Sequence, residues 1–585
     1  MLVLLLLVPL LAALGAAAVA PQGLSRFIAL AGSLASLALL PLVSSGTYVL
    51  QWFSSAGFAF GIVTSVSQLN LLLLAMVLGI APLVMLYSFG FMDTLSQQRR
   101  FYAEMLAFEA AMALFAMSGS FITIFIAWEF LSLTSYLLIG FWNERESANA
   151  AARKAISIVL IGDMAMLAAI AVMAVAFKTL TFSGVIAGFS ADPGAALVSV
   201  ALLAVAALTK SAQLPFQEWL ADAMEGPAPV SAFLHSTTMV KAGVFLIMLL
   251  LPMISGAGLA PAISVFGLIT AAIATTNALK ERQVKRVIAY STVQELGLMI
   301  FAVASGAVIA GVFLFFAQSF YKALLFFSSG AMMKATDNED ITRISGLRRN
   351  RVLYVATIFG VLSLAGFVPF DGFFASSAIG SAFSANLAYY VILNAFGLLT
   401  SFYIFRWFLF TEQRDEKARD AVGFEAIPRS MSYSAAALGV ATVLASLGVL
   451  YFMGTFRMPY AVASNLVIDP ADAAIVTGIA VAGALSSYAV FRKRVGVMNI
   501  MANRVLYSRW LFNSLYRAVA AFVLGMASGA VMLERGIDSA FRGIGMSLYG
   551  SAAFVRRISY GEINYYVLTL SAAMVATVVL VYMAR

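Results

Sequence analysis

Long apolar stretches recur along the whole chain and are separated by short segments rich in arginine and lysine. An uncharged stretch such as 431–453 exceeds the roughly 20 residues that a helix needs to cross a bilayer core about 30 Å thick. The pattern predicts an all-α polytopic membrane protein with about sixteen transmembrane helices. The predicted spans lie near 1–21, 26–45, 66–92, 101–118, 120–141, 153–177, 195–216, 229–253, 258–280, 286–304, 306–333, 353–379, 383–410, 431–455, 472–491 and 561–583.

The first apolar stretch, residues 1–20, has two interpretations. Its small residues at Ala17, Ala18 and Ala20 fit the cleavage site of a secretory signal peptide. No basic residue precedes Leu2, however, and a signal peptide normally begins with one. We therefore interpret the stretch as the first membrane span.

The basic residues alternate between dense and sparse loops. If the N-terminus lies outside, almost all of them fall in cytoplasmic loops, as the positive-inside rule requires. The opposite loops then hold almost only Lys178 and Arg457. The cytoplasmic set is Arg99, Arg100, Arg145, Arg153, Lys154, Arg282, Lys285, Arg286, Arg343, Arg348, Arg349, Arg351, Arg492, Lys493 and Arg494.

Residues 500–558 break this alternation, because seven arginines interrupt the apolar stretches there. Were 518–533 a span, Arg535, Arg542, Arg556 and Arg557 would lie on the wrong side. We therefore predict a long lateral helix in the interface at the cytoplasmic face, kinked near Gly543 and Gly550. The last span follows it at 561–583.

The amino-acid composition excludes several classes of protein and of cofactor site. Hydrophobic residues make up 62% of the 585 residues and charged residues 11%, which excludes a soluble enzyme. The chain has no cysteine, so disulfides, thiolate-bound zinc and cysteine-ligated iron–sulfur clusters are excluded, and one histidine cannot form a metal site alone. We expect no cofactor in this chain. The net charge of +9 reflects the loop arginines rather than a nucleic-acid surface.

Seven charged or titratable residues stand out inside the predicted spans. A charge at the bilayer centre costs about 2.5–3.5 kcal/mol on insertion scales, so each one needs a reason. Such residues commonly mark ion or proton pathways, and we expect a path for protons here. The seven are Glu129, Asp163, Lys210, His235, Lys241, Glu295 and Lys322.

Glu129 and Lys210 are expected to interact inside the membrane. Lys210 precedes Pro215, which removes a backbone hydrogen bond and loosens the helix around it. A change in the distance between the carboxylate and the ammonium would let the lysine release or take up a proton, whereas a static buried ion pair is the alternative.

His235, with Ser236, Thr237 and Thr238 to hold water, is a candidate proton relay. The alternative is a neutral histidine that is hydrogen-bonded within the bundle.

Lys241 lies six residues beyond His235, which is about 9 Å along a helix axis and on a different face. It could pass protons to another part of the bundle.

Several motifs resemble one family of membrane proteins. The segment KSAQLPFQEWLADAMEGPAPVSAFLHSTTMVKAG at 210–243 is similar to the signature of antiporter-like subunits of respiratory complex I and of multisubunit cation/proton antiporters. Further similarity lies in WEFLSLTSYLLIGFW at 128–142, VKRVIAYSTVQELGLM at 284–299, SFYKALLFFSSGAMM at 319–333 and LSLAGFVPFDGFF at 362–374.

The resemblance implies two inverted five-helix repeats, spans 4–8 and 9–13, each with a broken helix at Pro215 or Pro369. It implies that Glu129 and Lys210 are the coupling pair, that His235 and Lys322 form the central relay, and that Asp163 is an accessory acid. The implied domains are N-terminal helices at 1–100, the two repeats at 101–253 and 258–410, C-terminal helices at 431–491, the lateral helix at 500–558 and the final helix at 561–583.

The tail over 500–558 resembles the lateral helix of the subunit called L of complex I, whereas HSTTMVKAG with Lys241 is closer to the A-type antiporter subunit. The first resemblance implies a proton-translocating subunit in a prokaryotic plasma membrane, next to other membrane subunits, with iron–sulfur clusters, flavin and quinone on partners. A sodium/proton antiporter subunit is the alternative, and a non-pumping scaffold held by the lateral helix is a third.

The distal half departs from the family pattern. Where many relatives carry two histidines before the span-11 lysine, this chain has Leu314 and Gln318, and Ser376 replaces the usual span-12 lysine. We hypothesise that Glu295 and Asp371 compensate, because the inverted repeat places span 10 opposite span 5. Glu295 should then lie within about 6 Å of Lys322, close enough to influence its charge. The alternative is that Glu295 only hydrogen-bonds within the bundle.

Overall fold

The computed structural model is built almost entirely of long apolar helices. It describes residues 2–19, 22–55, 58–93, 97–412, 422–455 and 469–491, and beyond them only isolated positions from 514 to 576. The elements are α1 Leu2–Leu14, α2 Gln22–Leu39, β1 Gly46–Ser55, β2 Phe58–Val66, α3 Gln68–Phe91, α4 Gln98–Ala116, α5 Phe121–Ile139, α6 Glu146–Phe177, α7 Phe182–Gly188, α8 Pro193–Lys210, α9 Glu218–Asp222, α10 Ala228–Ser236, α11 Met239–Gly256, α12 Ala260–Lys280, α13 Val284–Ala304, α14 Val308–Thr336, α15 Arg351–Ala365, α16 Asp371–Phe383, α17 Leu387–Glu412, α18 Arg429–Thr455 and α19 Pro470–Phe491.

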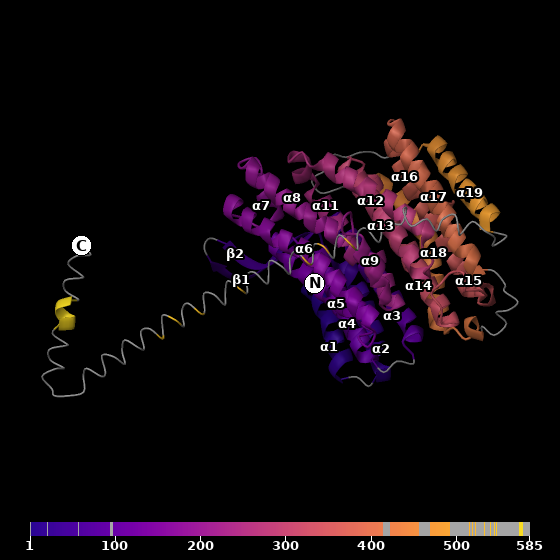
Figure 1. The fold of residues 1–585 in the computed structure, drawn as a ribbon, viewed down its shortest axis with the longest axis horizontal. Helices are drawn as coiled ribbons and strands as arrows, with labels where there is room; N and C mark the ends of the chain where they lie inside the picture. Colours follow the sequence, from indigo (N-terminus) through magenta and orange to yellow (C-terminus); the bar gives the residue numbers. More distant parts are fainter. Residues whose placement is uncertain are drawn as a thin grey trace. The chain divides into compact units, whose positions relative to one another are not determined.

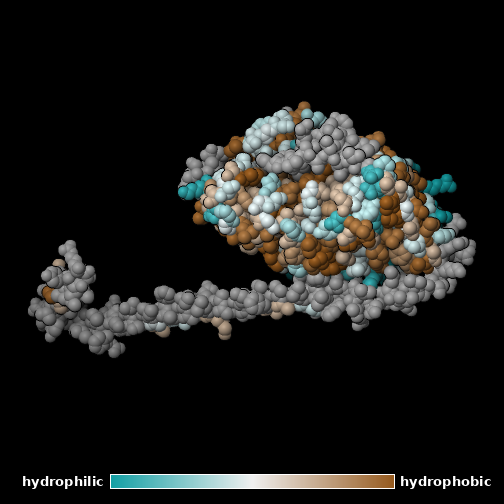
Figure 2. Space-filling view, turned by 90° about the horizontal axis from the view of Figure 1, so that it is seen from above, coloured by the Kyte–Doolittle hydropathy of each residue, from teal (hydrophilic) through white to brown (hydrophobic). Residues whose placement is uncertain are grey.

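The outer surface of the helical unit is apolar. Twelve helices of the described residues are long and apolar enough to cross a membrane. Large hydrophobic side chains project outward from several of them, such as Val175, which is 81% exposed, and Leu387, which is 74% exposed. Figure 2 shows broad hydrophobic areas on this unit, with hydrophilic residues gathered in separate patches. Because a surface of this kind is stable against lipid, the prediction of a multi-pass helical membrane protein is confirmed.

Helices α13 and α14 form the centre of the bundle. Nearly every residue of α13 is buried, and α14 packs against α3, α10, α13, α15, α16 and α18. In Figure 1 these two helices lie between a group that contains α4 to α8 and a group that contains α15 to α19. Glu295 on α13 and Lys322 on α14 are therefore buried inside the bundle.

A β-hairpin formed by β1 and β2 lies between α2 and α3, so the all-α prediction is wrong for residues 46–55 and 58–66. Strands β1 and β2 pair antiparallel, with Gly46 opposite Val66 and Tyr48 opposite Thr64. The β-branched and aromatic residues of this segment favour extended backbone. The hairpin is joined to the α4–α5 connection, where Ser65 N–H donates to the Met117 carbonyl at 2.8 Å.

Three predicted spans are interrupted. The interruptions at Pro215, between α8 and α9, and at Pro369, between α15 and α16, were predicted and are confirmed. The span predicted at 229–253 was expected to be one helix, but it divides into α10 and α11 at Thr237 and Thr238. The Thr238 hydroxyl donates to the Phe233 carbonyl at 2.7 Å, and hydroxyl groups that take backbone carbonyls in this way compete with helical hydrogen bonds.

Residues Met1–Arg509 form one compact unit and Trp510–Arg585 a second. The predicted lateral helix at 500–558 and the final span at 561–583 lie outside the described residues, apart from isolated positions. Both stay predictions.

Helices α12 and α13 approach closely at a pair of glycines. A Cβ on Gly267 would lie 2.6 Å from the Gly297 carbonyl oxygen, and a Cβ on Gly297 would lie 2.5 Å from the Gly267 carbonyl oxygen. Small residues allow backbones to pack this tightly in membrane bundles. The contact fixes the rotation of α13, which carries Glu295 two residues before Gly297.

Gly297→Ala should therefore destabilise the bundle by about 1–3 kcal/mol, because the added methyl group forces the two helices apart. The expected result is a lower unfolding midpoint of the detergent-solubilised protein in a thermal melt. Gly478→Ala is the matched control, since a Cβ at this exposed position on α19 meets nothing within 4 Å. An equal midpoint for both variants would contradict the proposed tight contact.

Candidate functional site

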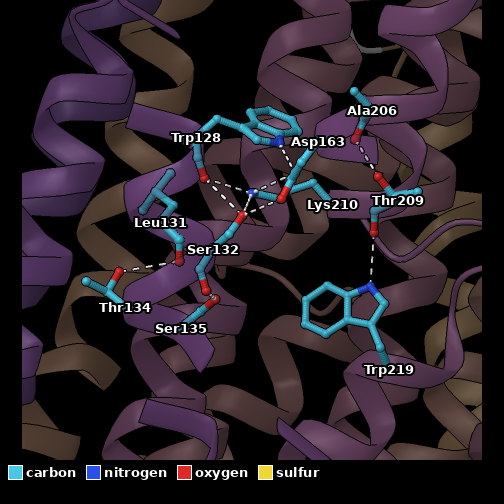
Figure 3. Close-up of polar contacts among 10 residues, drawn as sticks. All are labelled: Trp128, Leu131, Ser132, Thr134, Ser135, Asp163, Ala206, Thr209, Lys210 and Trp219. Atoms are coloured by element: carbon cyan, nitrogen blue, oxygen red, sulfur yellow. Dashed lines mark hydrogen bonds and ion pairs between the residues drawn. The ribbon is translucent and has the colours of Figure 1, made fainter. Parts of the chain in front are cut away.

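Lys210, the last residue of α8, lies at the centre of a buried polar cluster (Figure 3). Its Nζ lies 2.5 Å from Ser132 Oγ, 3.0 Å from the Trp128 carbonyl oxygen and 3.7 Å from Asp163 Oδ1. The Trp128 indole N–H donates to Asp163 Oδ1 at 2.7 Å, and Ser132 donates to Asp163 Oδ2 at 3.0 Å. These four residues, the proximal cluster, join α5, α6 and α8.

The local sequence explains how the proximal cluster assembles. Trp128 and Ser132 are four residues apart on α5 and so share one face of that helix. Gly162 on α6 faces Thr209 on α8 so closely that a Cβ there would overlap the threonine hydroxyl. The two backbones can therefore approach, and Asp163 comes within reach of Lys210.

Glu129 does not contact Lys210 directly, and its role as the coupling partner of Lys210 stays a prediction. Within the described residues, the ion pair of Lys210 is with Asp163, and Glu129 Oε1 accepts no hydrogen bond. Adjacent helical residues point about 100° apart, so Trp128 and Glu129 cannot both face α8. Asp163, predicted as an accessory acid, is the direct partner, while half-buried Glu129 acts on Lys210 from a greater distance.

Lys322 on α14 and Glu295 on α13 form the second buried pair. Lys322 Nζ lies 2.8 Å from Glu295 Oε2 and 2.5 Å from Ser291 Oγ, and Tyr321 donates to Glu295 Oε1 at 2.7 Å. The prediction that Glu295 lies within about 6 Å of Lys322 is confirmed. We call Ser291, Glu295, Tyr321 and Lys322 the distal cluster. This ammonium–carboxylate distance of 2.8 Å is shorter than the 3.7 Å between Lys210 and Asp163.

Lys241 on α11 belongs with the distal cluster. Its ammonium donates to the Phe315 carbonyl and, at 2.5 Å, to Ser319 Oγ, both on α14. Glu295, Lys322 and Asp371 are the charged groups that act on it electrostatically. Lys241 and His235 were expected to lie on different faces, and this is confirmed because His235 contacts Trp219 and Phe326 instead.

His235, at the end of α10, lies between the rings of Trp219 and Phe326, at centroid distances of 6.2 and 6.1 Å. Neither ring nitrogen has a hydrogen-bond partner among the described residues. The alternative that His235 is a histidine hydrogen-bonded within the bundle therefore has no support from these contacts.

The hydroxyls expected to hold water beside His235 are engaged elsewhere. Ser236 donates to the Ala232 carbonyl and Thr238 to the Phe233 carbonyl, while Thr237 shares a hydrogen bond with Ser236. Backbone carbonyls at the end of α10 satisfy these donors locally.

Asp371 begins α16, next to the interruption at Pro369. Its Oδ1 accepts hydrogen bonds from the Ser363 hydroxyl and from the Gly372 N–H, the latter at 2.9 Å. The positive end of the helix dipole favours a carboxylate at this place. The side chain is fully buried, and these contacts connect α15 to α16.

Sequence reasoning did not single out several buried charges within predicted spans, among them Glu109 and Arg406. Glu109 on α4 accepts a hydrogen bond from Ser33 on α2. Arg406 on α17 donates to carbonyls at the end of α12, including Ala278 at 3.0 Å and Glu281 at 2.7 Å. Both were visible in the sequence as charges inside apolar stretches, and Arg406 has the structural role of capping a helix C-terminus.

Two families of known proteins match this chain. The family described as NADH:quinone oxidoreductase/Mrp antiporter, TM, matches residues 118–402, and the family described as NADH-Ubiquinone oxidoreductase (complex I), chain 5 N-terminus, matches residues 52–102. The two families together match more than half of the chain. They include both clusters of buried charge.

Individual relatives agree with these families. The chain is 29% identical to an NAD(P)H-quinone oxidoreductase chain 5 of Picosynechococcus sp., over 91% of this chain and 89% of the relative. It is 34% identical to NADH-quinone oxidoreductase subunit L of Mycobacterium tuberculosis, over 70% of this chain and 66% of that one. Its fold resembles a chain of the Mrp complex from Dietzia sp. with a TM-score of 0.72 and 22% identity, covering 100% of this chain and 63% of that chain. The chain therefore belongs to the family of antiporter-like membrane subunits of complex I-type NADH-quinone oxidoreductases and the related Mrp antiporters.

Proposed function

We propose that this chain is a proton-translocating subunit of a complex I-type membrane oxidoreductase. The observation that carries the proposal is the presence of two buried lysine–carboxylate pairs, Asp163–Lys210 and Glu295–Lys322, in one apolar bundle. Both lysines are fully buried. Burying an ion pair in this way contributes little stability compared with apolar residues of similar volume, so a purely structural purpose explains the pairs poorly.

The two pairs differ in a way that suits charge transfer. Lys210 is held mainly by neutral oxygens, with Asp163 Oδ1 at 3.7 Å and Glu129 acting from farther away. A displacement of α5 that brings Glu129 closer or moves it away would change the stability of the ammonium form. In this proposal Glu129 is a mobile control, Asp163 is the fixed partner, and Lys210 takes up or releases the proton.

Lys241, Lys322 and Glu295 continue the proposed path on the other side of the bundle, with His235 between the two clusters along the chain. Lys241 lies against α14, which carries Lys322, and the ion pair of Lys322 with Glu295 connects that helix to α13. We assign these residues to proton relay. Asp371 joins them as a buried acid that acts on Lys241.

The wider assembly is also part of the proposal. It comprises sixteen spans, inverted repeats over spans 4–8 and 9–13, and a lateral helix at 500–558 that contacts neighbouring membrane subunits. The N-terminus lies outside a prokaryotic plasma membrane, as the loop arginines favour. Iron–sulfur clusters, flavin and quinone belong to partner subunits, which accords with a chain that has no cysteine.

A sodium/proton antiporter subunit is the second candidate. The matching family description includes Mrp antiporters, and the buried Lys241 lies in the HSTTMVKAG segment that favours this alternative. Both candidates need a proton-conducting bundle. They differ in whether sodium is exchanged for the proton.

Lys210→Ala should stop proton translocation by this chain in the assembled complex. Loss of a positioned proton-transfer group slows such steps about 10²–10⁴-fold. The measurement is proton uptake per electron in inverted membrane vesicles. Because the single variant leaves Asp163 buried without its partner, Asp163→Asn with Lys210→Met provides a second, uncharged version.

Lys178→Ala, at an exposed lysine after α6, is the control for that experiment and should pump normally. Unchanged pumping by both Lys210 variants, with normal assembly, would instead identify the chain as a scaffold.

Sodium should have no effect on the proton gradient if the oxidoreductase proposal is correct. The test adds sodium to energised vesicles and follows internal pH with a fluorescent dye, because exchange would move protons in the opposite direction at once. We expect no pH change beyond that caused by an equal amount of choline salt. A rapid change that is lost in Lys210→Ala would support the antiporter.

A further inference from the structure

A chamber of about 80 Å³ lies beside the distal cluster. Glu295 forms part of its wall, together with Gln294, Ser376, Asn394 and Thr400 among the polar residues and Leu314 among the apolar ones. A water molecule occupies about 30 Å³ in the liquid, so the chamber has room for more than one. Most of the wall is apolar, and its few polar side chains supply hydrogen-bond partners for water.

Glu295 is the titratable residue of the wall among the described residues that form it. Leu314 and Ser376 occupy two places where the sequence lacks an expected histidine and lysine. Asp371, the other acid suggested to compensate, is not part of the wall and is engaged with Ser363 and Gly372. Only Glu295, of these two acids, can exchange a proton with the chamber.

Gly380 on α16 gives independent support for open space. It is buried and contributes to the chamber wall, yet a Cβ added to it would meet nothing within 4 Å. Buried glycines elsewhere in the bundle, such as Gly297, would place a Cβ against backbone atoms. A larger side chain at position 380 can therefore occupy the chamber without displacing a helix.

The chamber extends from Glu295 away from the arginine-rich loops. Glu295 lies near the middle of α13, whose first residues adjoin Arg282 and Arg286. Apart from residues of α13, the wall is formed by the ends of α15 and α16 and by the first halves of α14, α17 and α19, which face away from those loops. The Asp469 N–H, just before α19, donates to Ser381 Oγ near the end of α16 at 3.2 Å, so these ends meet.

We propose that Glu295 and this chamber form the exit for protons, an inference that rests on the proposed proton translocation. The Lys322 ammonium transfers a proton to Glu295: an N–H bond breaks, an O–H bond forms, and a neutral amine and a carboxylic acid remain. Glu295 then gives that proton to water in the chamber, which carries it to the face opposite the arginine-rich loops. Lys322 is reprotonated from the side of Lys241.

The first test asks whether water reaches the chamber. Because the chain has no cysteine, Ser376→Cys introduces its only thiol. A water-soluble, thiol-specific cationic reagent should label this position at least roughly tenfold faster than Ser377→Cys, since accessible thiols react faster than enclosed ones. Ser377 is the neighbouring buried serine outside the wall. Equal, slow labelling at both positions would overturn the proposal.

The second test fills the chamber or removes its acid. Gly380→Leu and Glu295→Gln should each lower proton uptake per electron as far as Lys210→Ala does in the assembled complex. Gly478→Leu, at an exposed position of α19, should leave it unchanged.

If Lys210→Ala stops pumping while Gly380→Leu and Glu295→Gln pump normally, the exit is elsewhere and the proposed function stands. If Lys210→Ala also pumps normally, the proposed function itself fails. A partial rescue of Glu295→Gln by Ser376→Lys would support the chamber, because it restores a titratable group to the same wall.

Discussion

A lysine ammonium can lie inside an apolar bundle only where oxygen atoms replace its lost water shell. Lys210 obtains them from a serine, a tryptophan carbonyl and Asp163, and Lys322 from a serine and Glu295. In each case these oxygens belong to helices other than the one that carries the lysine. The arrangement of α5, α6 and α8, and of α13 and α14, must therefore satisfy these two cations as well as pack apolar side chains.

The same constraint explains why the helices are irregular near the charges. α8 ends at Lys210, and α10 ends just after His235. α16 begins at Asp371, whose carboxylate accepts the first free N–H group of that helix. Helix ends expose backbone dipoles that compensate charge inside a membrane, which an uninterrupted span cannot do. Glycines such as Gly162 and Gly297 then allow the close backbone approach that brings partners within reach.

The two clusters have different chemical capacities. In the proximal cluster the lysine shares its site with neutral donors and acceptors, and a second acid, Glu129, lies on the same helix as Trp128 without contacting Lys210. In the distal cluster Lys322 contacts Glu295 directly, and that acid borders a chamber whose mostly apolar wall also holds a few polar side chains. A site that can gain or lose a carboxylate neighbour suits control, and a site beside water suits release. The missing span-12 lysine is therefore compatible with a complete path.

The sequence by itself determined the apolar helices, the identity of most buried charges, the interruptions at Pro215 and Pro369, and the proximity of Glu295 to Lys322. These features depend on local transfer free energy, on proline chemistry and on motifs that lie close together in the chain. Only the tertiary structure decided that Asp163 rather than Glu129 contacts Lys210, that the Ser236 and Thr238 hydroxyls bind backbone carbonyls, and that residues 46–55 and 58–66 pair as strands. Such pairings depend on the rotation of each helix about its axis and on contacts between distant segments, and a one-residue change in rotation moves a side chain by about 100°.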